Sequence, residues 1–315
     1  MTTTKTNISP YETYKKPSWF SKNWIAIVTI FLGLISINLI FFSKSYQGDT
    51  IDPTKAGQLG DFVGGNIGTI FALVSVMFLY LTLRDQRESS TIEKFETKYF
   101  ELLKLHRDNV SEIGLGEDFG KKIFVILIRE FREILKIAKE VSQKHNLNYS
   151  HEKLFVASYC GLFFGVGPNS SRMLKDSLFE FDKVFVDDFE ATMNNKETKM
   201  RVKEERRFKF IPFEGHQSRL GHYYRHLYQT VCYVDNKDFD IDKYEYVKTV
   251  RAQLTTHEQA LLFINTLSPH GRIWNEETLL LRYRFVKNIP PNFFDPENEI
   301  NLSSYFPNDY FEWQE

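Results

Sequence analysis

The chain has 315 residues and carries 40 Lys and Arg against 41 Asp and Glu, a formal net charge of −1. This balance excludes bulk electrostatic attraction to nucleic acid or to anionic lipid as the main signature of the chain. A hydrophobic content of 42% excludes collagen-like, low-complexity and wholly disordered classes, and two cysteines are too few for a disulfide scaffold.

Two uncharged apolar segments interrupt a chain whose mean hydropathy, −0.35, is typical of a soluble protein. The first is WIAIVTIFLGLISINLIFF at residues 24–42, and the second is FVGGNIGTIFALVSVMFLYLTL at residues 62–83. A helix needs about 20 apolar residues to cross a bilayer. A cleaved signal peptide has a shorter apolar region, which ends in a small-residue cleavage site. We find no such site before the second segment. We therefore expect a two-helix N-terminal transmembrane hairpin rather than two buried core helices.

Positive charges flank the two predicted spans unevenly. Lys5, Lys15, Lys16 and Lys22 precede the first span, and four Lys or Arg follow the second, but the connecting segment holds only Lys44 and Lys55. Because Lys and Arg accumulate on the cytoplasmic side of membrane helices, this pattern predicts a multi-pass protein with both termini in the cytoplasm. Cys160 and Cys232 would then lie in a reducing compartment and are expected to be free thiols.

This topology divides the chain into four parts. They are a cytosolic tail (1–23), a transmembrane hairpin (24–83), a helical cytosolic domain (84–290) and an aromatic C-terminal tail (291–315). The tail is expected to pack on the domain or on another subunit.

Small and polar residues in the spans predict how the membrane helices pack. Gly60, Gly64 and Gly68 follow one another at four-residue spacing, which allows close approach of helix backbones in lipid. Asn38 and Asn66 should lie at similar depth in the two spans, where an amide–amide hydrogen bond across the hairpin would be favourable. We interpret this set as helix packing rather than as an ion pathway, because two spans cannot line a pore without oligomerisation.

The rest of the chain predicts an all-α domain. Apolar residues recur at helical spacing over residues 91–113, 121–145, 151–164, 170–193, 216–234, 242–254, 255–267 and 276–288. The first of these helices places His106 on its apolar face and is expected to continue directly from the second span. Thr255 and Glu258 have the spacing of a capping box. Residues 114–120 are expected to form a loop, and the charged residues 194–209 a loop or an exposed helix end.

The densest polar cluster is GHQSRLGHYYRHLY at residues 215–228, in which a helix would place Arg219, His222, Arg225 and His226 near one another. Three interpretations remain open. His222 and His226 have the spacing of a metal-binding pair, but no third ligand is evident. Arg219 and His226 form an Arg-x6-His pattern that resembles the motif of HEPN ribonucleases, in which His and Arg would supply a base and a cation for metal-independent RNA cleavage. The third interpretation, a structural seam between helices, is the one that we favour.

Motifs for cofactors and metals are otherwise missing from the sequence. We find no phosphate-binding glycine loop, no nucleophile elbow, no Cys-x-x-Cys pair and no EF-hand loop. We therefore expect no cofactor and no metal, and whether the chain is an enzyme stays open.

Four blocks resemble one family in the same order. They are GDFVGGNIGTIFALVSVMFLYLTLRDQRES, FETKYFELLKLH, GHYYRHLYQTVCYVD and YEYVKTVRAQLTTHEQALLFINTL. Together they cover about residues 20–290 and resemble the AbiC-like membrane proteins of bacteria that act in phage abortive infection. Thr255 is a mild departure, because the family often has Ser at this capping position. The resemblance implies no catalytic residue for this chain, because the family has no established catalytic residues.

The resemblance implies anti-phage defence at the bacterial inner membrane, by arrest or killing of the infected cell. The expected mechanism couples a cytosolic domain that senses infection to a membrane effector hairpin. The expected partners are the lipid bilayer, further copies of the chain, and a phage protein or nucleic acid as trigger. A membrane-tethered ribonuclease using Arg219 and His226 is the first alternative, and a non-catalytic scaffold that recruits another effector is the second.

Overall fold

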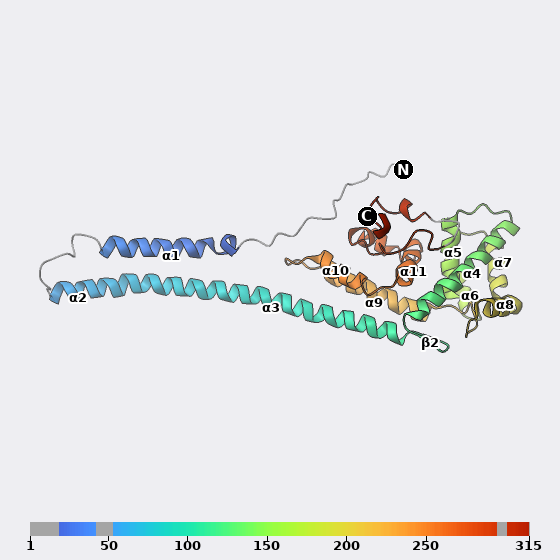
Figure 1. Ribbon diagram of the computed structural model, residues 1–315, viewed down its shortest axis with the longest axis horizontal. Helices are drawn as coiled ribbons and strands as arrows, with labels where there is room; N and C mark the ends of the chain where they lie inside the picture. Colours follow the sequence, from blue (N-terminus) through green and yellow to red (C-terminus); the bar gives the residue numbers. More distant parts are fainter. Residues whose placement is uncertain (1–18, 42–52, 295–300, 315) are drawn as a thin grey trace. The chain divides into compact units, whose positions relative to one another are not determined.

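The computed structural model describes residues 19–41, 53–294 and 301–314. Its internal contacts divide the chain into two compact units, Met1–Lys98 and Tyr99–Glu315, and helices dominate both (Figure 1). An all-α fold is therefore confirmed. Lys5, Lys15, Lys16 and Lys44, on which the topology prediction depends, lie outside the described residues, so the topology stays a prediction.

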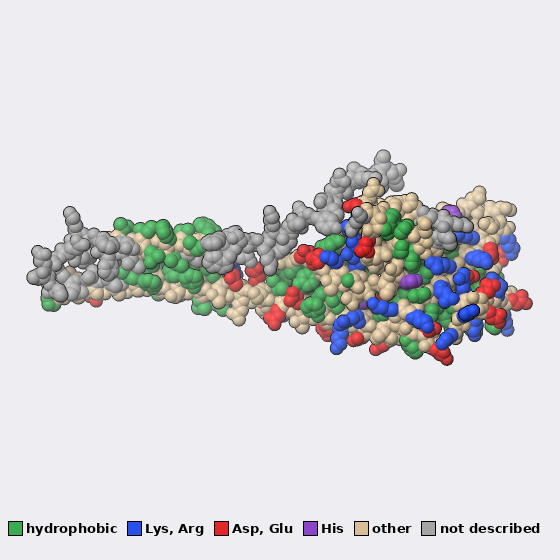
Figure 2. Space-filling model, viewed as in Figure 1, with side chains coloured by type: hydrophobic (Ala, Val, Ile, Leu, Met, Phe, Trp, Pro, Cys, Tyr) green, Lys and Arg blue, Asp and Glu red, His purple; other side chains and the backbone are tan. Residues whose placement is uncertain are grey.

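The first unit contains two helices with apolar, outward-facing segments, α1 (Trp19–Phe41) and the start of α3 (Gly68–Glu112), and a short, more polar helix, α2 (Pro53–Phe62), between them. A π-helical turn (Val63–Ile67) follows α2. The run Gly60–Glu112 is long and apolar enough to cross a membrane, and 6% of its apolar window is buried. It is the one such run in the described part of the chain, because the apolar stretch of α1, Asn23–Ser36, is shorter. Figure 2 shows apolar side chains over these helices.

The second predicted span and the following helix form one element. Helix α3 continues without a break from Gly68 to Glu112, as the sequence predicted. The helical run begins at Pro53, however, so residues 53–61 of the segment that connects the two predicted spans are helical as well. The π-helical turn joins α2 to α3 and contains both Gly64 and Asn66.

The second unit is a helical domain with one short hairpin. The hairpin pairs β1 (Gly114–Leu115) with β2 (Asp118–Phe119), where a loop was expected. The helices are α4 (Lys122–Lys144), α5 (His151–Phe164), α6 (Ser170–Ser177), α7 (Lys183–Asn194), α8 (Lys196–Arg206), α9 (Gln217–Asp235), α10 (Lys243–Arg251), α11 (Thr256–Leu267), α12 (Ile273–Glu276) and α13 (Leu279–Arg282). Two 3₁₀ turns, Leu302–Ser304 and Glu312–Gln314, lie in the C-terminal tail.

Helices α4, α5 and α11 form the centre of this domain. They pack on one another, and α7 and α9 add to the outside of the group. The core is strongly aromatic, with edge contacts such as the 5.3 Å separation between the rings of Phe131 and Phe155. In α11 every residue from Glu258 to Thr266 is buried. Thr255 and Glu258 form the predicted capping box, with both reciprocal hydrogen bonds present.

The segment before α9 crosses the end of α5 at very short range. Gly165 and Gly215 have positive φ angles of 70° and 85°, and a Cβ on Gly215 would come within 2.1 Å of the carbonyl oxygen of Phe164. The amide of His216 donates to the carbonyls of Leu162 and Phe163, 3.1 and 2.9 Å away. Only glycine allows this conformation and this approach, so the Gly-rich turn after α5 fixes the start of α9.

The predicted helix over residues 170–193 is wrong, because residues 178–182 separate α6 from α7. Contacts from the start of α5 hold this break. The Tyr149 hydroxyl donates to Asp182 at 2.5 Å, and Lys153 Nζ donates to the carbonyl of Glu180 at 3.0 Å. The charged residues after α7 do form an exposed helix, α8, whose N-terminus is capped by the side chain of Asn195.

The predicted helix over residues 276–288 is also interrupted. Thr278 and Arg284 have positive φ values of 57° and 46°. The buried guanidinium of Arg251 donates to the carbonyls of Tyr283 and Arg284, each at 2.9 Å, and so holds the chain in place where the helix is interrupted. The aromatic tail packs back on the same domain, where Tyr310 and Phe311 are buried.

Candidate functional site

Helix α9 separates two groups of polar side chains. Its buried face consists of Leu220, Tyr223, Tyr224, Leu227, Thr230, Val231 and Val234. Arg219 and His226, two helical turns apart, border this face on one side, and Tyr228, Cys232 and Asp235 lie toward the other side. The predicted cluster and a surface pocket therefore occupy different sides of one helix.

The four residues of the predicted cluster have different environments. Arg219 is partly buried, and its Nε donates to the carbonyl oxygen of Gly114 in the hairpin at 2.7 Å. His222 and Arg225 are exposed, while His226 is half-buried with both ring nitrogens inaccessible to solvent. This arrangement fits the structural interpretation, because Arg219 joins α9 to the hairpin and His226 faces inward. A catalytic role for these residues stays a prediction.

His226 stacks on His106, a residue of α3 to which the sequence assigned no partner. The two ring centroids are 6.1 Å apart and the ring planes differ by 19°. His106 is 2% exposed, and burial lowers its pKa to about 4, with smaller electrostatic contributions from His226 and Lys121. Burial also lowers the pKa of His226, and His222 adds to that effect. Both imidazoles are therefore neutral at pH 7.

A chain of contacts joins this histidine pair to the centre of the domain. The ring of Tyr223 lies 5.4 Å from that of His106. The Tyr223 hydroxyl donates to the carboxylate of Glu258 at 3.1 Å. Glu258 is fully buried and also accepts the amide of Thr255 at 2.7 Å, which closes the capping box of α11. A path of direct contacts thus runs from α3 through α9 to α11.

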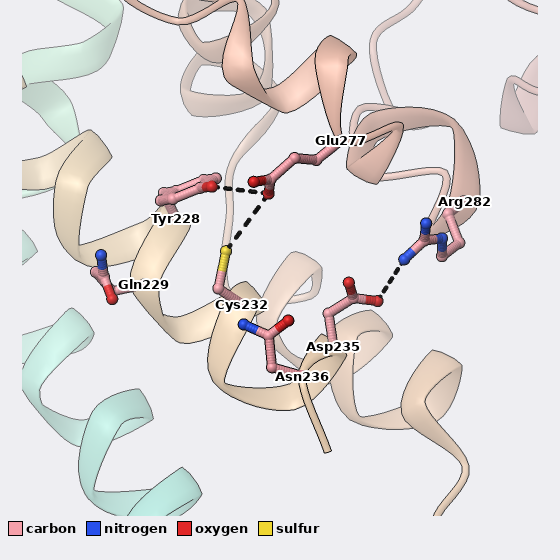
Figure 3. Close-up of a pocket in the computed structure, with 7 residues that line it drawn as sticks. All are labelled: Tyr228, Gln229, Cys232, Asp235, Asn236, Glu277 and Arg282. Carbon is pink, nitrogen blue, oxygen red and sulfur yellow. Dashed lines mark hydrogen bonds and ion pairs between the residues drawn. The ribbon is translucent and has the colours of Figure 1, made fainter. Parts of the chain in front are cut away.

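A polar pocket of about 460 Å³ lies on the other side of α9 (Figure 3). Its lining residues come from α9 and from the segment around α12 and α13; they are Tyr228, Gln229, Cys232, Asp235, Asn236, Glu277 and Arg282. Arg282 pairs with Asp235 at 2.6 Å, and Tyr228 donates to Glu277 at 2.7 Å. This pocket was not predicted, because Glu277 and Arg282 follow α9 by more than forty positions in the chain.

The predicted helix-packing residues lie in the first unit. Gly60, Gly64 and Gly68 are exposed, and a Cβ on any of them would meet no atom within 4 Å. The π-helical turn between Gly60 and Gly68 also widens the helix, so the regular four-residue spacing of the predicted stripe is lost there. Asn66 is exposed within this turn. The side chain of Asn38 lies outside the described residues, so the Asn38–Asn66 hydrogen bond stays a prediction.

Metal ligands do not converge in the described residues, where no group of three or more His, Cys, Asp and Glu could hold an ion. His222 and His226, the pair with metal-binding spacing, face different surroundings, since one is exposed and the other points inward. Cys160 and Cys232 are free thiols, as expected.

The fold and the site define a class of protein: an all-α domain whose centre is formed by α4, α5 and α11, preceded by an exposed apolar helix. Residues 215–294, which include α9 to α13, match the model of a family described as "Putative phage abortive infection protein". This match confirms the resemblance to phage abortive infection proteins. Searches of curated proteins and of solved structures give no match.

Proposed function

We propose that the protein acts in abortive infection against phage as a membrane-bound sensor and effector. The helical domain responds to an infection cue, a phage protein or nucleic acid, and the N-terminal helices act on the bacterial inner membrane. The family match over residues 215–294 supports the role in defence. The exposed apolar part of α3 is the observation that supports the role of the membrane.

The apolar segment has the features that a lipid environment requires. Phe71, Leu73, Val76 and Tyr80 are each more than half exposed, which would be costly in water. Hydroxyl groups in this segment donate to carbonyls of the same helix, as Ser75 does to Phe71 at 2.8 Å and Thr82 to Phe78 at 2.8 Å. Polar groups of a helix in lipid must find partners in this way.

Two spans per chain require several copies to enclose a path through the bilayer, so we infer a homo-oligomer in which α1 and α3 of neighbouring copies pack together. The space beside Gly64 is open, so a helix of another copy can pack against the backbone there. In this mechanism the assembled helices change state on infection and depolarise the cell.

Expression of the gene alone in a susceptible bacterial host tests this function. We expect protection of the culture, retention of the protein in carbonate-washed membranes, and loss of membrane potential in infected cells. Gly64→Leu should abolish protection, whereas Val76→Leu, a matched change at an exposed apolar position, should not. Protection with an intact membrane potential in arrested cells, unaffected by Gly64→Leu, would refute the membrane mechanism, and release of the protein by carbonate would refute its anchoring.

A further inference from the structure

The contact between α3 and α9 contains an unusual concentration of unsatisfied polar atoms. In the described part of the chain, six buried side-chain nitrogen or oxygen atoms have no hydrogen-bond partner, and four of them are the ring nitrogens of His106 and His226. Buried polar atoms are almost always paired in folded proteins, so each exception calls for an explanation. Here the exceptions coincide with one stacked pair of rings.

Neutral imidazole carries one N–H donor and one acceptor nitrogen. In water each of these groups would be hydrogen-bonded, but in the contact with α9 none of them is. Separation of the two helices would therefore restore hydrogen bonds to water and offset part of the apolar contact that is lost. The polar groups beside the pair do not supply the missing hydrogen bonds, because they donate to other acceptors. Tyr223 directs its hydroxyl to Glu258 at 3.1 Å, and Lys121 donates to the carbonyl of Gln253 at 2.9 Å.

The start and the middle of this part of α3 are held differently. Near its start, the Tyr99 hydroxyl donates to the carbonyl of Tyr246 at 2.7 Å, and the two rings pack edge to face at 5.1 Å. Toward the C-terminus, each following turn of the helix buries one side chain; these are Leu103, His106 and Val110. The stacked histidines occupy the middle of this surface, where an apolar side chain would hold the helix more firmly.

We propose that the contact of Tyr99–Glu112 with α9 and α10 is a release point, kept weak by the His106–His226 pair, through which the domain signals to the rest of α3. This inference rests on the proposed function, because the signal is the disengagement of a helix that continues from the apolar segment. The path from His106 through Tyr223 to Glu258 gives the route by which an event in the α9–α11 region changes the strength of the contact.

Hydrogen–deuterium exchange on the full-length protein in detergent micelles tests the release point. In the wild type, amides of residues 99–112 should exchange faster than those of α11. His106→Leu should slow exchange over residues 99–112 about tenfold, since it removes unpaired polar atoms from the contact. Tyr99→Phe should accelerate exchange there, and Glu101→Gln, an exposed change on the same helix, should leave it unchanged.

Exchange in His106→Leu as fast as in the wild type would overturn the proposal. If His106→Leu does not fold, His226→Leu removes the other half of the pair and decides the question in the same way. In infected cells, a folded His106→Leu protein should lose protection because release is blocked, and full protection would overturn the signalling step. Failure of the wild type to protect would instead refute the proposed function, while the exchange comparison would still decide whether the contact is weak.

Discussion

His106 makes the stability of the domain depend on pH. Its pKa is about 4 in the folded protein, against 6.5 for an unperturbed histidine. Above pH 6.5 the residue is neutral in both states and stability is at its full value. As pH falls from 6.5 toward 4, the unfolded chain takes up a proton that the folded chain does not, so stability falls.

Between pH 7 and pH 5 the loss due to this residue should be about 2 kcal/mol. Chemical denaturation of the purified protein in micelles at the two pH values measures it. His106→Phe should remove this part of the pH dependence, and His222→Gln, at an exposed position, should keep it. An unchanged slope in His106→Phe would show that the ring is not buried as described.

The two thiols should differ in reactivity. Cys160 is fully buried in α5, and burial raises its pKa to about 11. Cys232 is half-buried at the wall of the pocket, 3.9 Å from the Glu277 carboxylate. With native protein at pH 8, a maleimide should modify Cys232 first, because the reagent can reach Cys232, whereas Cys160 is buried. Cys232→Ser should abolish the fast reaction and Cys160→Ser should not; a fast reaction that persists without Cys232 contradicts the structure.

At the level of elements, the crossing between α5 and the start of α9 is the most sensitive joint. Gly215→Ala would place a Cβ 2.1 Å from the Phe164 carbonyl oxygen at a φ of 85°, so it should cost roughly 3 kcal/mol or more. Gly221→Ala is the matched control inside α9, where the nearest atom would be 3.7 Å away and helix propensity should add about 0.5–1 kcal/mol of stability. Denaturant midpoints measure both, and a neutral Gly215→Ala would mean that the crossing is looser than described.

Elements with local signals were predictable and those held by distant contacts were not. Thr255 and Glu258 carry their capping signal within four residues, and the structure confirms it. The break between α6 and α7 depends instead on Tyr149 and Lys153, and the end of α13 depends on Arg251. None of these partners can be read from the apolar periodicity of the segment that they interrupt. The histidine pair shows the same limit, because His106 was visible on its helix face but its stacking on His226 was not.

For the whole molecule, the membrane topology is the prediction with the widest consequences. In a Cys160→Ser, Cys232→Ser background, Lys44→Cys should react with a membrane-impermeant maleimide in intact cells, because the connecting segment is expected outside. Lys196→Cys, at the exposed start of α8, should react only after permeabilisation. Labelling of both positions, or of neither, in intact cells would refute the two-span arrangement.

The composition of the whole chain predicted little of this by itself. A mean hydropathy of −0.35 combines a charged domain with an apolar helix that is exposed over most of its length. The apolar runs and the charges beside them carry the membrane prediction. The contacts that complete the domain come from side chains far apart in sequence, such as Arg132 on the carbonyl of Phe293 at 2.6 Å.

The segment before α9 crosses the end of α5, and this crossing limits which part of the chain can fold on its own. The family match begins at residue 215, at the glycine that fits against Phe164, and the next amide already donates to α5. Helix α11, at the centre of the matched segment, is covered by α4 and α5, which precede it. Residues 215–294 are therefore not an autonomous folding module, and a fragment cut at their borders would expose its own core. A chimaera that carries this segment should therefore also carry α4 and α5, on which α11 packs.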